Sequence, residues 1–241
     1  MTTTATINAK EASVTPAAAG KVYGGVEPAL TGSLSGFLAA DGVSATYSRT
    51  AGEDVAGSPY TISATLNPAG VLANYVITFN TAAFTITPAS VTMTWSDPAD
   101  ITYGTALSAT QLNATPSVAG TFTYLPAAGS VLDAGSNQSL TVHFVPTDAA
   151  NYSTPSDTTV HINVLKATAS VTLTGLSQTF DDTPKAAVAT TDAAGTSSFT
   201  VTYDGSSTAP TAVGSYAVLA TLINDNYTGT ASGTLEIAQP H

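Results

Sequence analysis

The residues that most often carry catalysis in proteins are scarce in this sequence. There is no cysteine, which excludes a thiol nucleophile, a disulfide and a thiolate zinc site. The three histidines are His143, His161 and His241, and the last of them is terminal. A serine or threonine nucleophile needs a histidine and a carboxylate beside it, and no Gly-x-Ser-x-Gly turn is present. We therefore expect no catalytic residues and no enzymatic activity.

Two of the histidines form the first candidate for metal binding. Apolar residues alternate with polar ones in residues 140–145 and 160–164, and this pattern predicts that His143 and His161 both face outward. If the two segments form a hairpin, the imidazoles become cross-strand neighbours. Two histidines bind a transition metal weakly, because a working site needs three or four ligands. The pair stays a weak metal candidate, and solvated polar positions are favoured.

Aspartates offer a second candidate, a calcium ion clamped between two domains. Carboxylate oxygens are the ligands that calcium prefers, and an acidic chain supplies them. None of these residues lies in a dense Asp-x-Asp-x-Asp loop, so turn formation is their expected role. No cofactor is predicted, and calcium at domain joints remains an alternative. The available ligands are Asp97, Asp100, Asp181, Asp182 and Asp225. Of these, the adjacent Asp181 and Asp182 are kept as weak metal candidates.

A covalent crosslink between a lysine and an asparagine is a third possibility. It needs a buried lysine, an asparagine and a carboxylate in one place, and Lys10, Glu53 and either Asn74 or Asn80 are available. The simpler interpretation is that Lys10 is an exposed charge that protects the edge of a sheet against strand addition.

Composition limits the kinds of partner. The chain has 241 residues, of which 16 are acidic and 5 basic, with a formal net charge of −11. Binding to nucleic acid is excluded because it needs clustered basic residues. No apolar run approaches the roughly 20 residues that cross a bilayer, so no membrane insertion is expected. Residues 1–5 lack the features of a signal peptide and residues 239–241 look cut rather than capped, so we interpret the chain as a fragment of a longer protein.

The sequence repeats three times. An Asn-Tyr dipeptide recurs with its tyrosines 77 and 75 residues apart, and an aromatic residue near the start of each copy recurs at spacings of 80 and 77. Marks that recur together at one period indicate tandem copies. The residues concerned are Tyr75, Tyr152 and Tyr227 for the dipeptide, and Tyr23, Tyr103 and Phe180 for the aromatic.

Each copy is expected to be a β-sandwich. Hydrophobicity alternates with a period of two, and Gly, Pro, Asn and Asp separate the alternating runs. We predict an all-β chain of three immunoglobulin-like sandwich domains in an elongated arrangement, with short connections. The predicted domains are residues 1–89, 90–166 and 167–241, and their closing strands are residues 84–86, 160–164 and 235–237.

A tyrosine close after a glycine supports the immunoglobulin-like fold. In such sandwiches this tyrosine bonds back to the preceding corner of the chain. Tyr216 stands two residues after Gly214, and Tyr60 stands three after Gly57. The middle copy opens the same corner at Gly135, where we expect Asn137 to replace the tyrosine.

The quoted motifs resemble a known family. Residues 21–24, 27–30 and 74–79, together with the closing run 86–89, resemble the MBG family of bacterial immunoglobulin-like surface repeats. Residues 202–205, 214–216 and 226–229 of the third copy are similar to the same superfamily. The middle copy, through residues 101–107, 111–114 and 146–152, is similar to other bacterial immunoglobulin-like repeats. The opening of the third copy departs from the family's Tyr-Asp-Gly pattern, with Phe180-Asp181-Asp182 in its place.

The resemblance implies an extracellular or cell-surface bacterial protein in which such repeats form stalks, with no catalytic residues to carry over. The expected partners are neighbouring repeats of the same longer chain, and a host or matrix glycan or protein is a further possibility. One alternative function is a ligand-binding adhesin module, which recognises glycan or protein through loops or an exposed strand edge. Another is an accessory module of a secreted enzyme. The lone Trp95 could serve as a sugar platform, but its alternating position favours packing.

Overall fold

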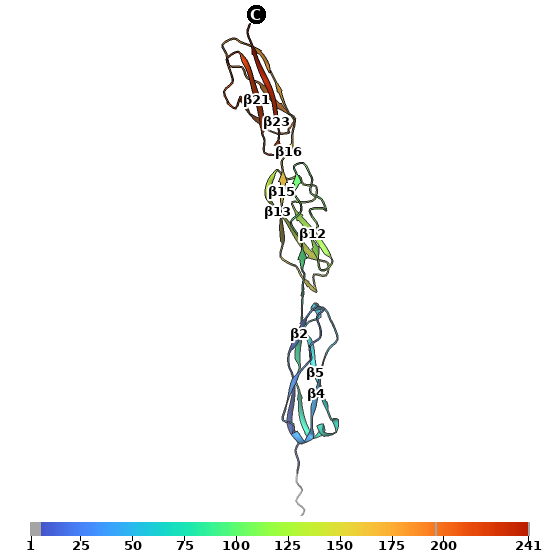
Figure 1. The fold of residues 1–241 in the computed structure, drawn as a ribbon. Helices are drawn as coiled ribbons and strands as arrows, with labels where there is room; N and C mark the ends of the chain where they lie inside the picture. The colour runs from blue at the N-terminus through green and yellow to red at the C-terminus, as the bar shows by residue number, and fades with distance from the viewer. Residues whose placement is uncertain (1–5, 196, 241) are drawn as a thin grey trace, which may run out of the picture. The chain divides into compact units, whose positions relative to one another are not determined.

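The computed structural model describes residues 6–195 and 197–240, and this part of the chain is built almost wholly of β-strands (Figure 1). Its helical segments are three short 3₁₀ turns, η1 (Ala39–Asp41), η2 (Val55–Gly57) and η3 (Ala69–Asn74). The prediction of an all-β chain is confirmed. Within the same residues, no helix has the length and apolar character needed to cross a membrane.

Packing divides the chain into two compact units. Unit 1 comprises Met1–Met93, Pro116–Phe122 and Phe144–Ser156, and unit 2 comprises Thr94–Thr115, Thr123–His143 and Asp157–His241. The three domain boundaries expected from the sequence remain a prediction.

Unit 1 contains a sandwich of two sheets. One sheet has the order β3-β1-β6 and the other β2-β7-β5-β4, and β1–β6 and β2–β7 are parallel pairs. The strands are β1 (Lys10–Pro16), β2 (Ala19–Val22), β3 (Gly32–Ser35), β4 (Ser44–Arg49), β5 (Tyr60–Asn67), β6 (Tyr75–Phe79) and β7 (Ala82–Thr87).

The core of this sandwich follows from the period-two pattern. Val14 of β1, Ile62 of β5 and Phe84 of β7 are completely buried, while their neighbours along each strand are more exposed. Strand side chains alternate between the two faces of a sheet, so one apolar face of each sheet is buried against the other.

Two further short strands of unit 1 form a two-stranded sheet of their own. The pair is β8 (Ala89–Ser90) and β14 (Tyr152–Ser153), which run parallel with Tyr152 opposite Ala89. A single residue, Pro88, separates β7 from β8.

Most of a sheet of order β10-β15-β13-β12 lies in unit 2, and β10 and β15 in it are parallel. Leu140, Ile162 and Val164 lie in its core and are at most 4% exposed. The strands are β10 (Ile101–Thr102), β12 (Gly120–Leu125), β13 (Gly135–Pro146) and β15 (Thr158–Leu165), and the short β9 (Met93–Thr94) and β11 (Thr115–Pro116) complete this part of the chain.

The rest of unit 2 repeats the same design. A sheet of order β18-β23-β21-β20 buries Val218, Leu235 and Ile237, and β17–β19 and β16–β22 form two-stranded sheets. The strands are β16 (Ala167–Thr168), β17 (Val171–Thr174), β18 (Ser177–Thr179), β19 (Val188–Thr191), β20 (Ser198–Tyr203), β21 (Gly214–Ile223), β22 (Tyr227–Thr228) and β23 (Thr230–Ala238). The closing strands expected at 84–86, 160–164 and 235–237 all form.

The third copy has its left-handed residue one position later than the first two copies. Gly24 and Gly104, which follow the first two aromatics, have φ angles of 71° and 91°. In the third copy Asp182, two positions after Phe180, has a φ angle of 61°. Aspartate tolerates this left-handed region better than most residues, so the chain adopts it here without a glycine.

Candidate functional site: a repeated asparagine clasp

Each copy contains a corner that a side chain of the following strand holds in place. The Tyr60 hydroxyl donates to the carbonyl oxygen of Asp54 at 2.8 Å, and the Tyr216 hydroxyl donates to that of Ala212 at 2.9 Å. The tyrosine corner expected from the sequence is confirmed in the first and third copies. We use "corner" for residues 54–55, 133–134 and 212–213.

The middle corner uses a different residue from the one expected. Gln138, not Asn137, donates to the Asp133 carbonyl, at 2.7 Å. The register of β13 against β15 shifts between Gly135 and Gln138, and Asn137 has a φ angle of 56°. A bulge adds one residue to a strand, so the side chain that reaches the corner is one position later than the spacing predicts.

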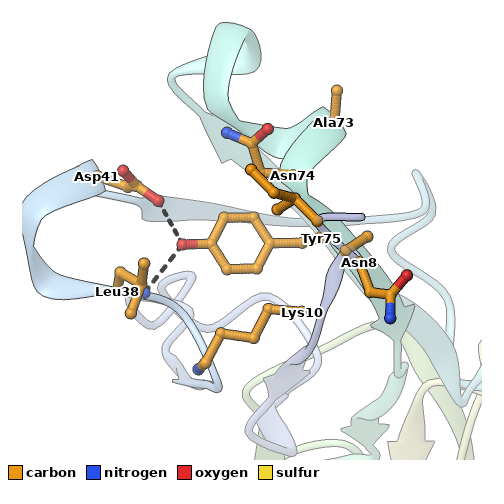
Figure 2. A pocket seen from close by; sticks show the side chains of 9 residues that line it. Asn8, Lys10, Leu38, Asp41, Ala73, Asn74 and Tyr75 are labelled. Carbon is orange, nitrogen blue, oxygen red and sulfur yellow. Dashed lines mark hydrogen bonds between the residues drawn. The ribbon is translucent and has the colours of Figure 1, made fainter. Parts of the chain in front are cut away.

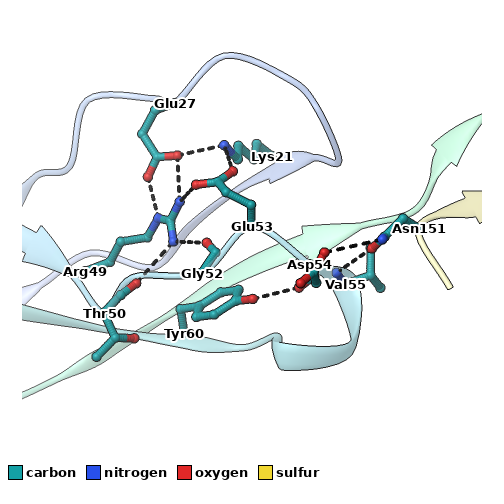
Figure 3. A network of polar contacts seen from close by, with 10 residues as sticks. All are labelled: Lys21, Glu27, Arg49, Thr50, Gly52, Glu53, Asp54, Val55, Tyr60 and Asn151. Carbon is teal, nitrogen blue, oxygen red and sulfur yellow. Dashed lines mark hydrogen bonds and ion pairs between the residues drawn. The ribbon is translucent and has the colours of Figure 1, made fainter.

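The asparagine of the second Asn-Tyr dipeptide binds the first corner (Figure 3). The Asn151 side-chain oxygen accepts the backbone N–H of Val55 at 2.9 Å. Its amide nitrogen donates to the carboxylates of Asp54 at 3.4 Å and Asp148 at 2.9 Å. Asn151 is 7% exposed, so these bonds satisfy a buried polar side chain. All of these residues belong to unit 1.

The third dipeptide makes the same contacts within unit 2. The Asn226 side-chain oxygen accepts the N–H of Ala134 at 2.7 Å, and its nitrogen donates to Asp133 at 2.9 Å. Asn224 orients the dipeptide by accepting the backbone N–H of Asn226 at 2.9 Å. We call this arrangement, an asparagine bound to the N–H and carboxylate of a corner, the Asn clasp.

An aromatic pair accompanies each clasp. The rings of Tyr23 and Tyr152 meet edge to face with centroids 5.4 Å apart, and those of Tyr103 and Tyr227 do so at 5.3 Å. Edge-to-face pairs are a favourable arrangement of aromatic rings. Burial raises the pKa of Tyr23, and the negative charge of Asp148 adds to the effect. The aromatics near the start of the first and second copies therefore meet the dipeptide tyrosines of the second and third copies.

The first Asn-Tyr dipeptide differs from the other two. The Tyr75 hydroxyl donates to the Asp41 carboxylate and accepts the N–H of Leu38 at 3.0 Å (Figure 2). The Tyr75 ring also packs on Phe37. Asn74 is exposed, and its side chain makes no hydrogen bond to the described residues. The tyrosine is fixed, while the asparagine is free.

Four charged side chains form a closed network in unit 1 (Figure 3). Lys21 contacts Glu27 at 3.0 Å and Glu53 at 2.5 Å, and Arg49 contacts the same two carboxylates at 2.5 and 2.6 Å. Hydrogen bonds from Arg49 and then Lys21 lower the pKa of Glu27 to about 2, and the same two cations lower the pKa of Glu53. Every member already has partners of opposite charge, as in a structural ion-pair network.

The guanidinium of Arg49 also covers the core. It lies 4.6 Å from the ring centroid of Phe84 and 5.3 Å from that of Tyr60. It donates to the carbonyl oxygens of Thr50 and Gly52 as well. This network was not expected from the sequence, although two of the five cations and a pair of glutamates within one copy were a usable signal.

The two histidines face outward as expected but are not cross-strand neighbours. Ser139 stands opposite His161, and His143 instead contacts Asp157 at 2.7 Å. The hairpin has a different register from the one that would pair the imidazoles, and a separation of four residues along a strand is about 13 Å. His241 lies outside the described residues.

The aspartates proposed as calcium ligands have separate partners. Asp97 accepts the N–H of His161 at 2.7 Å, and Asp100 accepts from Asn163 at 3.0 Å. Lys185 pairs with Asp181 at 2.6 Å and lowers its pKa to about 2. Among residues 6–195 and 197–240, no three or more His, Cys, Asp or Glu side chains come together as a metal site, and this includes Asp182 and Asp225.

The remaining candidates also have structural contacts. Lys10 donates to the carbonyl of Gly36, and Glu53 belongs to the charged network, so the set expected for a crosslink is not brought together. Trp95 packs on the core of unit 2, donates to the Gln111 carbonyl at 3.1 Å and meets Tyr124 edge to face. The expectation of packing for Trp95 is confirmed.

Two stretches of the chain match family models of MBG domains. Residues 12–85 match the MBG domain of the YGX type, and residues 169–241 match a second MBG domain model. The chain carries two MBG domains. The resemblance drawn from the sequence is confirmed for the first and third copies, and each MBG domain contains one of the tyrosine corners described above. A comparison with curated proteins found no match.

Several solved structures are similar at low identity. Drosophila N-cadherin EC1-4 is 10% identical with a TM-score of 0.34, covering 98% of this chain and 76% of that one. The four N-terminal Ig domains of Dscam1 isoform 9.44 are 11% identical with a TM-score of 0.32, and the match covers 96% of this chain and 73% of that one. The I9-I11 tandem from titin is 9% identical with a TM-score of 0.26, and the match covers 97% of this chain and 98% of that one.

Proposed function

We propose that this chain is a structural spacer segment of a large exported bacterial protein and performs no catalysis. The observation that carries the proposal is the length of the connections. Pro88 alone separates β7 from β8, and Lys166 alone separates β15 from β16. A connection of one residue has little conformational freedom compared with a flexible linker.

The clasps add to this stiffness. The backbone N–H of Ala89 donates to the Asn151 carbonyl at 2.9 Å, and that of Ala167 donates to the Asn226 carbonyl at 2.9 Å. Each connection is thus hydrogen-bonded to the residue whose side chain binds a corner. Such repeats maintain a fixed reach, which is the property that a spacer needs.

The proposed location is the bacterial cell surface or the surrounding medium, in keeping with the MBG domains. The proposed partners are neighbouring repeats of the same chain. Four charged groups of unit 1, Lys21, Arg49, Glu27 and Glu53, are paired with one another. This supports a structural role for the domain.

Small-angle X-ray scattering of the monomer tests the spacer function. A globule of 241 residues has a radius of gyration of about 18 Å. Three sandwiches end to end, each about 40 Å long, give about 35 Å. We expect the larger value, unchanged by calcium or by a chelator. The smaller value would contradict the spacer function, and so would a saturable ligand that binds one set of loops.

A further inference from the structure

The Asn clasp joins residues that belong to different predicted repeats. Asn151 lies in the second predicted repeat and Val55 in the first, while Asn226 lies in the third and Ala134 in the second. The same three groups meet both times: an asparagine side chain, a corner N–H and a corner carboxylate. A contact that recurs with the same chemistry at two places is a property of the repeat.

Strand pairing identifies the residue of the first repeat that is equivalent to the residues at the start of the second and third repeats. Tyr152 pairs with Ala89 and Tyr227 with Ala167, while Tyr75 pairs with Lys10. Lys10 therefore occupies the position of the residues that begin the second and third repeats. The residues that precede it correspond to the end of a closing strand.

The exposure of Ile7 agrees with this correspondence. Ile86 and Val164, each three positions before the paired alanine, are 2% and 4% exposed. Ile7, three positions before Lys10, is 95% exposed. A residue type that belongs in a core at this position has no core around it, which is a large apolar area left in water.

A cavity of about 420 Å³ lies beside these residues (Figure 2). Ile7, Lys10, Asp41 and Asn74 line it together with Tyr75. Asn74 has the position of Asn151 and Asn226, yet its side chain makes no hydrogen bond to the described residues. The asparagine half of a clasp is present here without a corner.

The third copy has the other half of a clasp, a corner with no asparagine bound to it among the described residues. The hydroxyl of Tyr216 marks Ala212–Val213 as its corner, and Val213 is 41% exposed, with no hydrogen bond from its N–H to the described residues. Phe180 is equivalent to Tyr23 and Tyr103, because the backbone N–H of each donates to the carbonyl of the last residue in the closing strand of its own copy. Alanine replaces the aspartate of the other corners, so this half lacks its carboxylate.

We propose that the Asn74 end of the first MBG domain is a docking surface for the corner of a further repeat of the same kind. Its occupant presents a backbone N–H, an aspartate carboxylate and an aromatic ring. Lys10 lines the cavity, and its positive charge complements the incoming aspartate. The proposal rests on the spacer function, in which one repeat follows another, and it identifies the surface and chemistry of each junction.

The corner of the third copy is the complementary surface, and it forms a weaker junction. Its N–H can donate to an incoming asparagine as those of Val55 and Ala134 do. The asparagine amide finds no carboxylate there, because the residue is Ala212. A hydrogen bond to a charged group is stronger than one between neutral groups, so Ala212→Asp should strengthen this junction.

Amide hydrogen exchange followed by NMR tests the clasp in the chain itself. In the single chain we expect slow exchange at Val55 and Ala134 and fast exchange at Val213. Asn151→Ala should speed exchange at Val55 at least tenfold and leave Ala134 unchanged, and Asn226→Ala should do the reverse. Exchange at Val55 that ignores Asn151→Ala would overturn the clasp.

A fusion of two chains tests the docking surface. In this fusion, residues 6–238 of the leading copy are joined directly to residues 9–241 of the trailing copy. The carbonyl of Ala238 accepts the same kind of backbone hydrogen bond as those of Thr87 and Leu165, so Ala238 is the equivalent last residue of a closing strand. One residue then separates it from Lys10, as in the two natural connections. Val213 of the leading copy should then exchange at least tenfold more slowly than in the single chain, and more slowly still with Ala212→Asp. Val213 of the trailing copy is the internal control.

Asn74→Ala in the trailing copy should abolish this protection, while the same substitution in the leading copy should not. Unchanged exchange at both Val213 amides, with and without Ala212→Asp, would overturn the docking surface. Slow exchange at Val55 combined with a compact scattering radius would contradict the spacer function alone. Fast exchange at Val55 combined with an extended radius would contradict the clasp alone.

Discussion

The side chain of Asn151 binds the backbone of Val55, a residue 96 positions earlier in the sequence. Asn151 is buried, and the same amide donates to two carboxylates, those of Asp54 and Asp148. An asparagine can do this because its amide carries both an acceptor and two donors. A single side chain thus satisfies the polar groups of a corner and of a neighbouring loop.

Removing this side chain should destabilise unit 1. Asn151→Ala leaves the N–H of Val55 unpaired and two carboxylates without a shared donor. We expect a loss of about 1–3 kcal/mol in the free energy of unfolding, measured by urea denaturation. Asn74→Ala is the matched control, and an exposed asparagine without such bonds should change stability by about 0.5 kcal/mol or less. Equal losses in the two variants would contradict the prediction.

The charged network makes stability depend on acid pH. The pKa of Glu27 is lowered to about 2 by Arg49 and then Lys21, whereas an unfolded glutamate has a pKa of about 4.3. Because the folded pKa is the lower one, this stabilisation is complete above the unfolded pKa and is lost as the pH falls toward 2. Urea midpoints measured from pH 6 to pH 2 should therefore fall less steeply in Glu27→Gln than in the unmodified chain.

Glu11→Gln provides the control for this titration. Glu11 is exposed and forms no ion pair with the described residues, so its variant should keep the full pH dependence. A Glu27→Gln curve that runs parallel to that of the Glu11 variant would show that the network does not govern the response to acid.

The corner hydrogen bonds should each contribute measurably to stability. Tyr216→Phe removes only the hydroxyl that donates to Ala212, and Gln138→Leu removes the donor to Asp133. We expect each to cost about 1 kcal/mol, the net value of a typical hydrogen bond. Tyr47→Phe is a suitable comparison in unfolding experiments, since its hydroxyl makes no hydrogen bond to the described residues. A larger loss in Tyr47→Phe than in Tyr216→Phe would oppose this account.

Chelation should leave the melting temperature unchanged. Two of the aspartates considered as calcium ligands, Asp97 and Asp100, accept hydrogen bonds from His161 and Asn163. Calorimetry with added calcium and then with excess chelator checks this, with a shift of more than about 2 °C as the contrary result, since metal binding stabilises a folded state by mass action. Asp97→Asn should keep a similar melting temperature in both buffers.

Much of the fold could be predicted because it depends on local patterns. Alternation at Val160, Ile162 and Val164 identifies the buried face of one strand, and the Asn-Tyr dipeptide and the early aromatic, which recur at one period, together indicate the repeat. Trp95 was expected to pack and does so. Such features need only the period-two geometry of a strand and its burial on one side.

Features that depend on long-range register were missed. The role of Gln138 requires knowledge of a bulge, which shifts a strand by one residue without a mark that spacing alone reveals. The partner of Asn151 lies in another repeat, so the dipeptide signalled a repeat but not a contact. Asp54 and Asp133 recur 79 residues apart, close to the repeat length, and this spacing was the available signal.

The parallel strand pairs of the sheets bear on how each copy responds to force. In every copy an early strand pairs in parallel with the closing strand, as in β2–β7, β10–β15 and β18–β23. Tension that pulls an early strand and a closing strand in opposite directions acts along the strands and across their hydrogen bonds. All the bonds of such a pair then share the load at once, whereas in an antiparallel hairpin opened from its free end they break one after another. The pairing therefore suits each copy to withstand pulling as well as to fill space.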